Sequence, residues 1–194
     1  MIRKSKPVAY VAAMAISAFL ATSGWAQEPT VAGVWKQIDD STGTLGGLIL
    51  FRENNGLWEA YIVKMYPKPG DPENPACTAC AGDRKNQPVL GLRLIENSKR
   101  DGLSYENGTI LDPRNGSEYG VQLTLSPDNQ TLIVRGYLGI PLLGQSQEWK
   151  RLSEDERRKL QPEIERVKLG QTPSNDRAKP AKKKPIDAKG AFAK

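Results

Sequence analysis

The chain has 194 residues, with 28 Lys and Arg against 22 Asp and Glu, two Cys and no His. The absence of His excludes the Ser-His-Asp and Cys-His catalytic arrangements and every His-ligated metal site. The charge is divided unevenly: residues 27–170 hold 18 basic and 20 acidic side chains, whereas residues 171–194 hold 7 basic and 2 acidic ones. A nucleic-acid-binding domain carries basic residues on its folded surface, so this distribution argues against a nucleic-acid partner.

The first 26 residues are predicted to be an export signal. Three basic residues open the chain (Arg3, Lys4 and Lys6), Val8–Leu20 is apolar without a charge, and small residues occupy positions 24 and 26. We expect cleavage after Ala26 and a periplasmic location. As a helix, Val8–Leu20 would rise only about 20 Å, too short for a bilayer core of roughly 30 Å, so a membrane anchor is not expected.

Residues 27–152 are predicted to form the folded domain, which begins with three strands. The first is expected at Val31–Gln37 and the second at Gly46–Arg52. The third, Leu57–Met65, follows Asn54-Asn55-Gly56, a hairpin signal because Asn and Gly tolerate positive φ. The second and third strands are apolar on both faces, which suits a sheet that is covered on one face and lines a cavity on the other.

A Pro-rich loop at Tyr66–Pro88 then interrupts the strands and contains both Cys residues. Its five prolines exclude regular structure, and a loop of this length is often a lid or a binding loop. A strand is expected at Val89–Ile95, followed by a polar turn at Glu96–Gly102. Two short strands are expected next, at Leu103–Glu106 and Thr109–Leu111, with a turn at Asn107-Gly108 between them.

The last three strands are predicted at Ser117–Leu125, Gln130–Tyr137 and Gln145–Leu152. The first two of these alternate apolar and polar residues, as strands with one buried face do. Short connections force neighbouring strands to be antiparallel, and closure of the sheet avoids exposed edges. The sequence therefore predicts an all-β, eight-stranded antiparallel up-and-down barrel, with a two-sheet sandwich as the alternative.

Two segments follow the predicted barrel. A short helix is expected at residues 153–170, because Ser153-Glu154-Asp155-Glu156 is a capping box, and Pro162 should divide or kink this helix. Residues 171–194 are rich in Pro, Ala and Lys and are predicted to be a disordered basic tail, because they cannot bury enough apolar surface to fold. The tail either only keeps the protein soluble or makes weak contact with anionic envelope material.

Two family resemblances are visible in the predicted barrel. Gly33-x-Trp35 on the first strand and Arg151 on the last resemble the lipocalin signature, which implies a Trp packed across the closed end of a barrel beneath the Arg, in a cation–π contact worth about 0.5–2 kcal/mol. A more specific set of motifs, over roughly Ala32–Leu152, resembles a bacterial family of exported proteins known as domain of unknown function 2147. The motifs are Gly33-x-Trp35, Cys77-x-x-Cys80-x-Gly82, Pro88-x-x-Gly91-Leu92, Asn107-Gly108-x-x-Leu111-Asp112-Pro113, Gly116-x-x-Tyr119, Arg135-Gly136-Tyr137 and Gln147-x-Trp149-x-Arg151. This resemblance implies a lipocalin-like barrel in a Gram-negative envelope and brings no catalytic residues.

Cys77 and Cys80 form the sharpest local motif. In an oxidising compartment the pair is expected to form a disulfide that stiffens the Pro-rich loop. A redox-active pair is the alternative, but the motif does not open a helix, whose N-terminus would lower the pKa of a thiol. A zinc site needs four ligands and covalent haem needs a His after the second Cys; the sequence offers neither, so no metal and no cofactor are predicted.

Aromatic side chains of the predicted strands are the candidates for a ligand site. They line a cavity, fill the barrel or lie outside it, and an eight-stranded barrel has room for at most one small ligand. These residues are Phe51, Trp58, Tyr61, Tyr119 and Tyr137. Arg135 is expected on the solvent face of its strand, and the alternative is that it holds an anionic ligand group.

The acidic residues do not point to catalysis. Asp39, Asp40 and Asp112 lie in turns, where Asp side chains bond to their own backbone, so no catalytic residue is predicted and the protein is not expected to be an enzyme. We expect the barrel to bind a small apolar or amphipathic molecule. The alternative is an envelope interaction protein whose barrel is filled by its own side chains.

Overall fold

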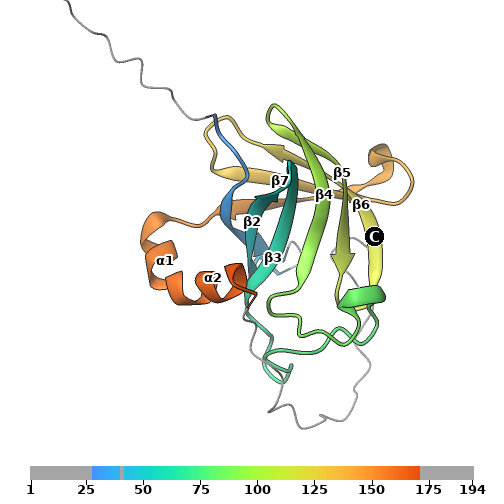
Figure 1. The fold of residues 1–194 in the computed structure, drawn as a ribbon, viewed down its shortest axis with the longest axis vertical. Helices are drawn as coiled ribbons and strands as arrows, with labels where there is room; N and C mark the ends of the chain where they lie inside the picture. The colour runs from blue at the N-terminus through green and yellow to red at the C-terminus, as the bar shows by residue number, and fades with distance from the viewer. Residues whose placement is uncertain (1–27, 40–41, 171–194) are drawn as a thin grey trace, which may run out of the picture.

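The computed structural model describes residues 28–39 and 42–170, so the predicted export signal and basic tail lie outside the described residues. Eight antiparallel strands form a closed barrel in which each strand pairs with its neighbour in sequence, and β1 pairs with β8 (Figure 1). This is the up-and-down barrel that the sequence predicts. The strands are β1 (Gly33–Ile38), β2 (Leu45–Asn54), β3 (Leu57–Met65), β4 (Arg93–Asp101), β5 (Ser104–Asp112), β6 (Ser117–Leu125), β7 (Thr131–Tyr137) and β8 (Gln145–Arg151).

The connections alternate between the two ends of the barrel, because the strands alternate in direction. We call one end the Trp35 end; it carries the β2–β3, β4–β5 and β6–β7 turns and the N-terminal segment, residues 28–32. The other, the loop end, carries the remaining connections, of which the β3–β4 loop, residues 66–92, is the longest. The β2–β3 turn is formed as predicted, since Asn55 and Gly56 both have positive φ.

Two predicted turns are wrong, because both segments lie inside strands. Most of Glu96–Gly102 belongs to β4, and Asn107-Gly108 lies within β5. Asn97 and Asn107 each have a φ of 60°, and the strand register shifts beside both of them. A β-bulge of this kind bends a strand without ending it. The Asn residues therefore mark curvature of the barrel wall and do not reverse the chain.

The predicted strand at Val89–Ile95 is also corrected, since β4 begins at Arg93. Val89 and Leu92 belong to the β3–β4 loop and are nevertheless buried, together with Cys77 and Cys80 of the same loop, in the main core cluster. The apolar residues that suggested a strand are thus inward-facing residues of a loop. This loop closes the loop end of the barrel with apolar side chains.

Side chains from every strand fill the barrel interior. They form one continuous buried cluster, in which each fully buried large side chain contributes about 1.5–3 kcal/mol to stability. One member from each strand in turn is Trp35, Ile49, Trp58, Ile95, Ile110, Val121, Leu132 and Trp149.

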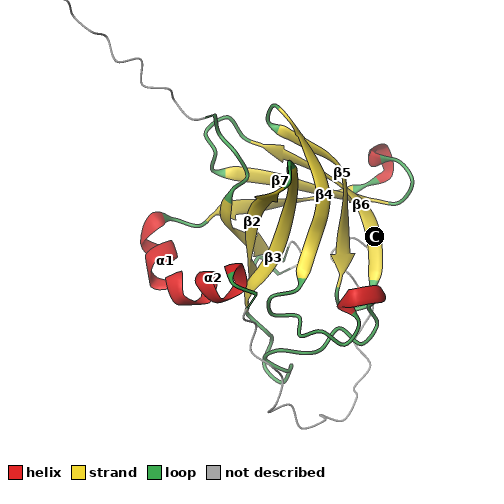
Figure 2. Cartoon of the chain, viewed as in Figure 1, coloured by secondary structure: helices red, strands yellow, loops and turns green. Residues whose placement is uncertain are grey.

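Two short helices follow the barrel, one of the two forms expected from the sequence. They are α1 (Glu154–Lys159), which begins with the predicted capping box at Ser153, and α2 (Gln161–Lys168), which holds Pro162 in its first turn. Ile164 and Val167 are buried against outward-facing residues of β1–β3, which explains why β2 and β3 are apolar on both faces. Figure 2 shows the two helices in red on one side of the barrel. No helix within residues 28–39 and 42–170 is long and apolar enough to span a bilayer.

Candidate functional site

Trp35 and Arg151 lie at paired positions of β1 and β8, where the barrel closes. The guanidinium of Arg151 lies 4.2 Å from the centre of the buried Trp35 ring, so the predicted contact is present. The Nε of Arg151 donates to Asn129 O (2.6 Å), its Nη1 donates to Ala32 O (2.7 Å), and its Nη2 donates to Thr30 O (2.7 Å). Arg151 thus ties the N-terminal segment and the β6–β7 turn to the last strand.

Gly33 allows this arrangement. It has a φ of +114°, and a Cβ at this position would lie 2.9 Å from Arg151 Nη1. Behind the ring, Trp35 Nε1 donates to Val31 O (2.8 Å), and Val31 N donates to the hydroxyl of Tyr105 (3.0 Å). Tyr105 is fully buried and was not among the predicted site residues; its signal in the sequence was the alternation of Ser104, Tyr105 and Glu106.

Cys77 and Cys80 form the disulfide that the sequence predicts. Both side chains are buried in the core cluster. The disulfide segment packs against the β5–β6 turn, because a Cβ at Gly116 would overlap the carbonyl of Ala79. The disulfide therefore fixes the part of the β3–β4 loop that covers the loop end.

The five predicted aromatic residues are divided between the two faces of the barrel wall. Phe51 and Trp58 face the interior and are buried, and Tyr119 is partly buried against the same cluster. Tyr61 packs with the outer cluster beneath α2, and Tyr137 is out of phase with the buried residues of β7. The prediction that Tyr61 and Tyr137 line an internal cavity is therefore wrong, because strand phase places them outside.

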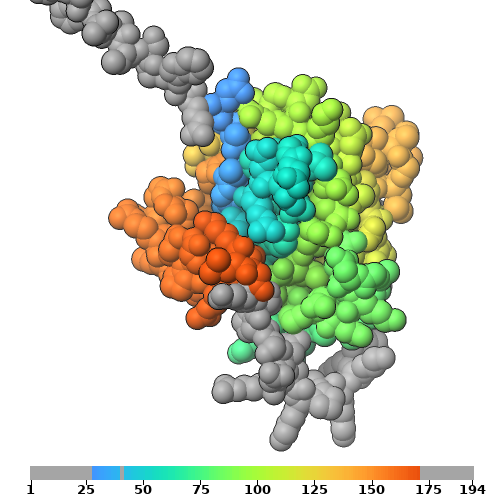
Figure 3. Space-filling model, in the orientation of Figure 1, coloured from blue at the N-terminus to red at the C-terminus, as the bar shows by residue number. Residues whose placement is uncertain are grey.

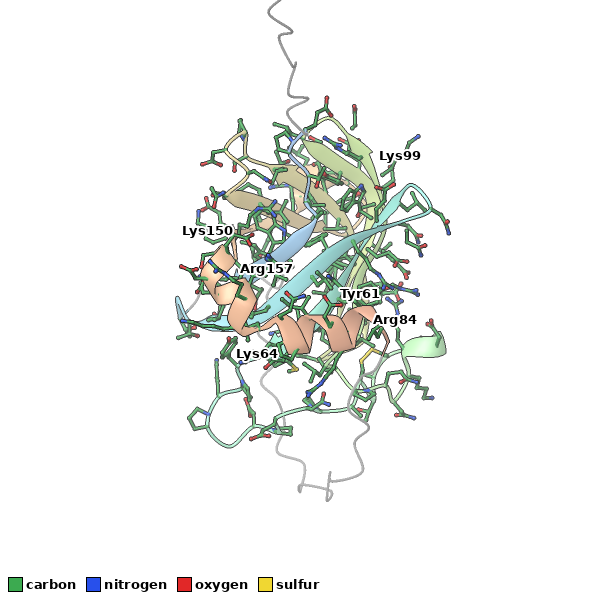
Figure 4. The ribbon with its side chains drawn as sticks, turned by 60° about the vertical axis from the view of Figure 1, so that its left-hand side comes forward. Tyr61, Lys64, Arg84, Lys99, Lys150 and Arg157 are labelled. Carbon is green, nitrogen blue, oxygen red and sulfur yellow. A yellow bond between two sulfur atoms is a disulfide. The ribbon has the colours of Figure 1, made fainter. Side chains whose placement is uncertain are left out.

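Tyr61 belongs to a polar network on the outer wall, beside α2 (Figure 4). The Nη2 of Arg52 donates to the Tyr61 hydroxyl (2.7 Å), which in turn donates to Glu59 Oε2 (2.6 Å). The guanidinium of Arg52 also lies 4.2 Å from the Tyr61 ring centre. Burial, together with the hydrogen bond to Glu59, raises the pKa of Tyr61, so its phenol keeps its proton at neutral pH.

A groove of about 680 Å³ lies outside the barrel, between the helix pair, the outer faces of β1 and β2, and the Trp35 end. Sites for small molecules have volumes of roughly 300–1,000 Å³, so the groove is large enough for one. Figure 3 shows the orange helices beside the blue N-terminal segment and the cyan β2–β3 hairpin that border it. Its outward-facing apolar residues are Val34, Leu50 and Ile164, and Phe51 and Trp58, whose side chains face the barrel interior, border it as well.

Four basic side chains and one acidic side chain also line this groove. The basic ones are Arg52, Arg100, Arg157 and Lys168, and the acidic one is Glu53. They come from four segments far apart in the sequence, so no local motif could have predicted their meeting.

Two of these cations are held by exposed ion pairs, and the Nη1 of Arg157 also donates to Gln161 Oε1 (3.3 Å). Arg157 pairs with Glu154 (2.7 Å) and Lys168 pairs with Glu165 (3.0 Å). Exposed pairs of this kind contribute about 0–1 kcal/mol, so an anionic ligand can compete for these cations. The Nε of Arg52 is buried and has no hydrogen-bond partner within the part of the chain that the structure describes. The other two cations are paired as well, because Arg52 lies 3.8 Å from Glu59 and Arg100 lies 3.1 Å from Glu28. The groove is thus lined by four basic side chains whose carboxylate partners lie outside its lining.

Residues 33–151 match a family described as uncharacterized proteins conserved in bacteria (DUF2147). The chain belongs to this family. A solved structure of a Helicobacter pylori protein, described as belonging to the lipocalin family, is similar to the DUF2147 chain with 19% identity and a TM-score of 0.58. The match covers 71% of the DUF2147 chain and 97% of the other. No curated protein matches the DUF2147 chain. The family and the lipocalin-like fold predicted from the sequence are both confirmed.

Proposed function

We propose that the DUF2147 chain binds a small amphipathic molecule with an acidic group, in the groove between the helix pair and the barrel wall. The observation that carries this proposal is the meeting of four basic side chains and a single acidic one in the lining of the groove. The lipocalin-like fold is compatible with a small ligand. The proposed site differs from the internal cavity expected from the sequence, because side chains of all eight strands occupy the interior.

The apolar part of such a ligand would meet only the exposed edges of Val34, Leu50 and Ile164, which are 3–4% exposed because they pack on one another. Apolar burial, at about 25 cal/mol per Å², therefore contributes little, and the charge contacts carry most of the affinity. Its acidic group would replace the carboxylates of Glu154 and Glu165 as the partner of Arg157 and Lys168. This exchange costs little, because both existing ion pairs are exposed to solvent.

Titration calorimetry with dodecanoate tests the proposal. The double variant Arg157→Ala/Lys168→Ala should bind dodecanoate about tenfold more weakly than the wild type, because two exposed charge contacts together are worth about 1.4 kcal/mol. The matched control is Arg158→Ala/Lys159→Ala, which removes the same charge from neighbouring helix positions that do not line the groove. Equal affinities of the two double variants would contradict the proposed site.

The charge of the ligand provides a second test. Dodecyltrimethylammonium has the same alkyl chain and a positive head, so it should bind the wild type more weakly than dodecanoate and should not respond to loss of the two cations. If both amphiphiles bind equally, apolar contact alone drives binding and the acidic group is no part of recognition.

A second candidate function is that of an envelope interaction protein with a side-chain-filled barrel. It is favoured by the continuous buried cluster inside the barrel, to which the β3–β4 loop contributes Cys77, Cys80, Val89 and Leu92. Deletion of Gln171–Lys194 should then abolish association with the envelope, and unchanged fractionation of the deletion variant would contradict this function.

We also propose that the protein is exported to the periplasm after cleavage at Ala26 and acts without catalysis. The basic and apolar pattern of the first 26 residues supports export. The near-complete burial of Asp112 against Arg114, whose Nε and Nη2 donate to it at 2.9 and 2.7 Å, supports a structural role for this carboxylate. The N-terminal sequence of protein from a periplasmic fraction should begin at Gln27; a retained leader would contradict this proposal.

A further inference from the structure

The β7–β8 loop, residues 138–144, exposes four large apolar side chains in one short segment. Their exposed fractions are 69% for Leu138, 54% for Ile140, 80% for Leu142 and 76% for Leu143. The loop contains the 3-10 helix η2 (Pro141–Leu143), which stands out from the barrel at the right of Figure 2. Contiguous exposed apolar surface on a soluble protein usually marks an interaction site.

No charged residue occurs from position 136 to position 147. The nearest charge on β7 is Arg135, which lies on the outer face of the barrel and donates hydrogen bonds to the loop. Its Nε donates to Pro141 O (2.6 Å), its Nη2 to Leu142 O (3.0 Å) and its Nη1 to Ser146 Oγ (3.0 Å). The exposed side chains are therefore presented by a backbone that is fixed in place.

The loop also satisfies much of its backbone internally. Ile140 N donates to Leu138 O (3.0 Å), Leu143 N donates to Ile140 O (3.2 Å), and Gly144 N donates to Pro141 O (3.0 Å). Pro141 has no N–H, and the carbonyl of Leu142 accepts from Arg135. Hydrocarbon offers no hydrogen bonds, so a segment leaves water for lipid at low cost only when its backbone groups are already paired.

We propose that the β7–β8 loop inserts Leu142 and Leu143 into the apolar region of a lipid bilayer and so holds the barrel at a membrane surface. The loop has seven residues, whereas a stable protein–protein interface needs roughly 20–30 residues on each side. Protein interfaces also have a polar rim, and this segment offers no charge to one. An uncharged apolar tip in which the carbonyls of Leu138, Ile140, Pro141 and Leu142 accept hydrogen bonds matches the lipid interior. This proposal does not depend on the groove.

A fluorophore that brightens on leaving water, attached to Leu143→Cys in the full chain, tests insertion at this site. The vesicles are phosphatidylcholine alone, so that basic residues elsewhere in the chain gain no electrostatic attraction. Emission from position 143 should increase and shift to the blue when vesicles are added. The same label on Leu169→Cys, a leucine after α2 that is 66% exposed, should not respond. No change at position 143, or an equal change at both positions, would overturn the proposal.

A second substitution measures how much the loop contributes. Leu142→Ser in the labelled chain should lower the apparent partition constant by about tenfold or more, since a fully buried leucine side chain is worth about this factor. Leu57→Ser, at an exposed leucine of the Trp35 end, is the control and should leave the constant unchanged. If the emission change instead occurs without vesicles and grows with protein concentration, the loop binds a second copy of the chain and the lipid proposal is wrong.

Discussion

Removal of the Arg151 side chain should be strongly destabilising. Arg151→Ala removes hydrogen bonds to the carbonyls of Asn129, Ala32 and Thr30 and the contact with the Trp35 ring. With about 1 kcal/mol for each hydrogen bond and about 1 kcal/mol for the cation–π contact, the free energy of unfolding should fall by about 4 kcal/mol. Because β1 and β8 close the barrel here, this loss of interactions should lower the stability of the whole barrel.

Urea unfolding followed by tryptophan fluorescence measures this loss. With a denaturant slope of about 2 kcal/mol per M, the midpoint of Arg151→Ala should fall by about 2 M. Arg151→Lys keeps the charge above Trp35 but lacks the planar fork that reaches three carbonyls, so it should lose about half as much. Lys150→Ala is the matched control, because Lys150 is the preceding cation on β8, and its exposed Nζ pairs with Glu148 and donates to Thr131. Figure 4 labels Lys150.

The reasoning would be refuted by either of two results. A loss below about 1 kcal/mol for Arg151→Ala would mean that Arg151 contributes no more to stability than an exposed ion pair, which is the range expected for Lys150→Ala. Equal losses in the Ala and Lys variants would show that the fork geometry contributes nothing, although the structure gives each guanidinium nitrogen its own carbonyl partner.

Two further predictions concern the loop end and α1. In the same urea assay, Gly116→Ala should lower the free energy of unfolding by about 3 kcal/mol and Gly102→Ala by about 1 kcal/mol. Both glycines have positive φ, but only at Gly116 would a Cβ overlap Ala79. Equal losses in the two variants would contradict this contact. The hydrogen bond from Lys36 lowers the pKa of Glu156 from 4.5 to about 2, so the stability that it contributes is complete above pH 4.5 and is lost as the pH falls through about 2. An NMR titration of Lys36→Ala should move the pKa of Glu156 back toward 4.5, and an unchanged pKa would exclude Lys36 as the cause.

Strand phase limited what could be predicted about the candidate site. On β6 and β7, apolar and polar residues alternate as the sequence predicts, and the apolar side chains of Val121, Leu123, Leu132 and Val134 are buried. On β3 both faces are apolar, because α2 covers the outer one, so Tyr61 could not be assigned to a side. The groove was missed for a related reason: its cations come from β2, the β4–β5 hairpin and both helices.

The sequence by itself determined the up-and-down order of the strands, the closure of β1 on β8 at Trp35 and Arg151, the disulfide and the capping box, because short connections and local motifs act over a few residues. It divided β5 into two strands, because Asn107 in a bulge has the same positive φ as a turn residue. Only the tertiary structure decided which apolar loop residues are covered. Val89 and Leu142 are both apolar residues of Pro-containing loops, yet the first is buried at the loop end and the second is 80% exposed. Whether a residue is buried depends on which distant segment packs on it, and closure of the barrel determines which segments meet.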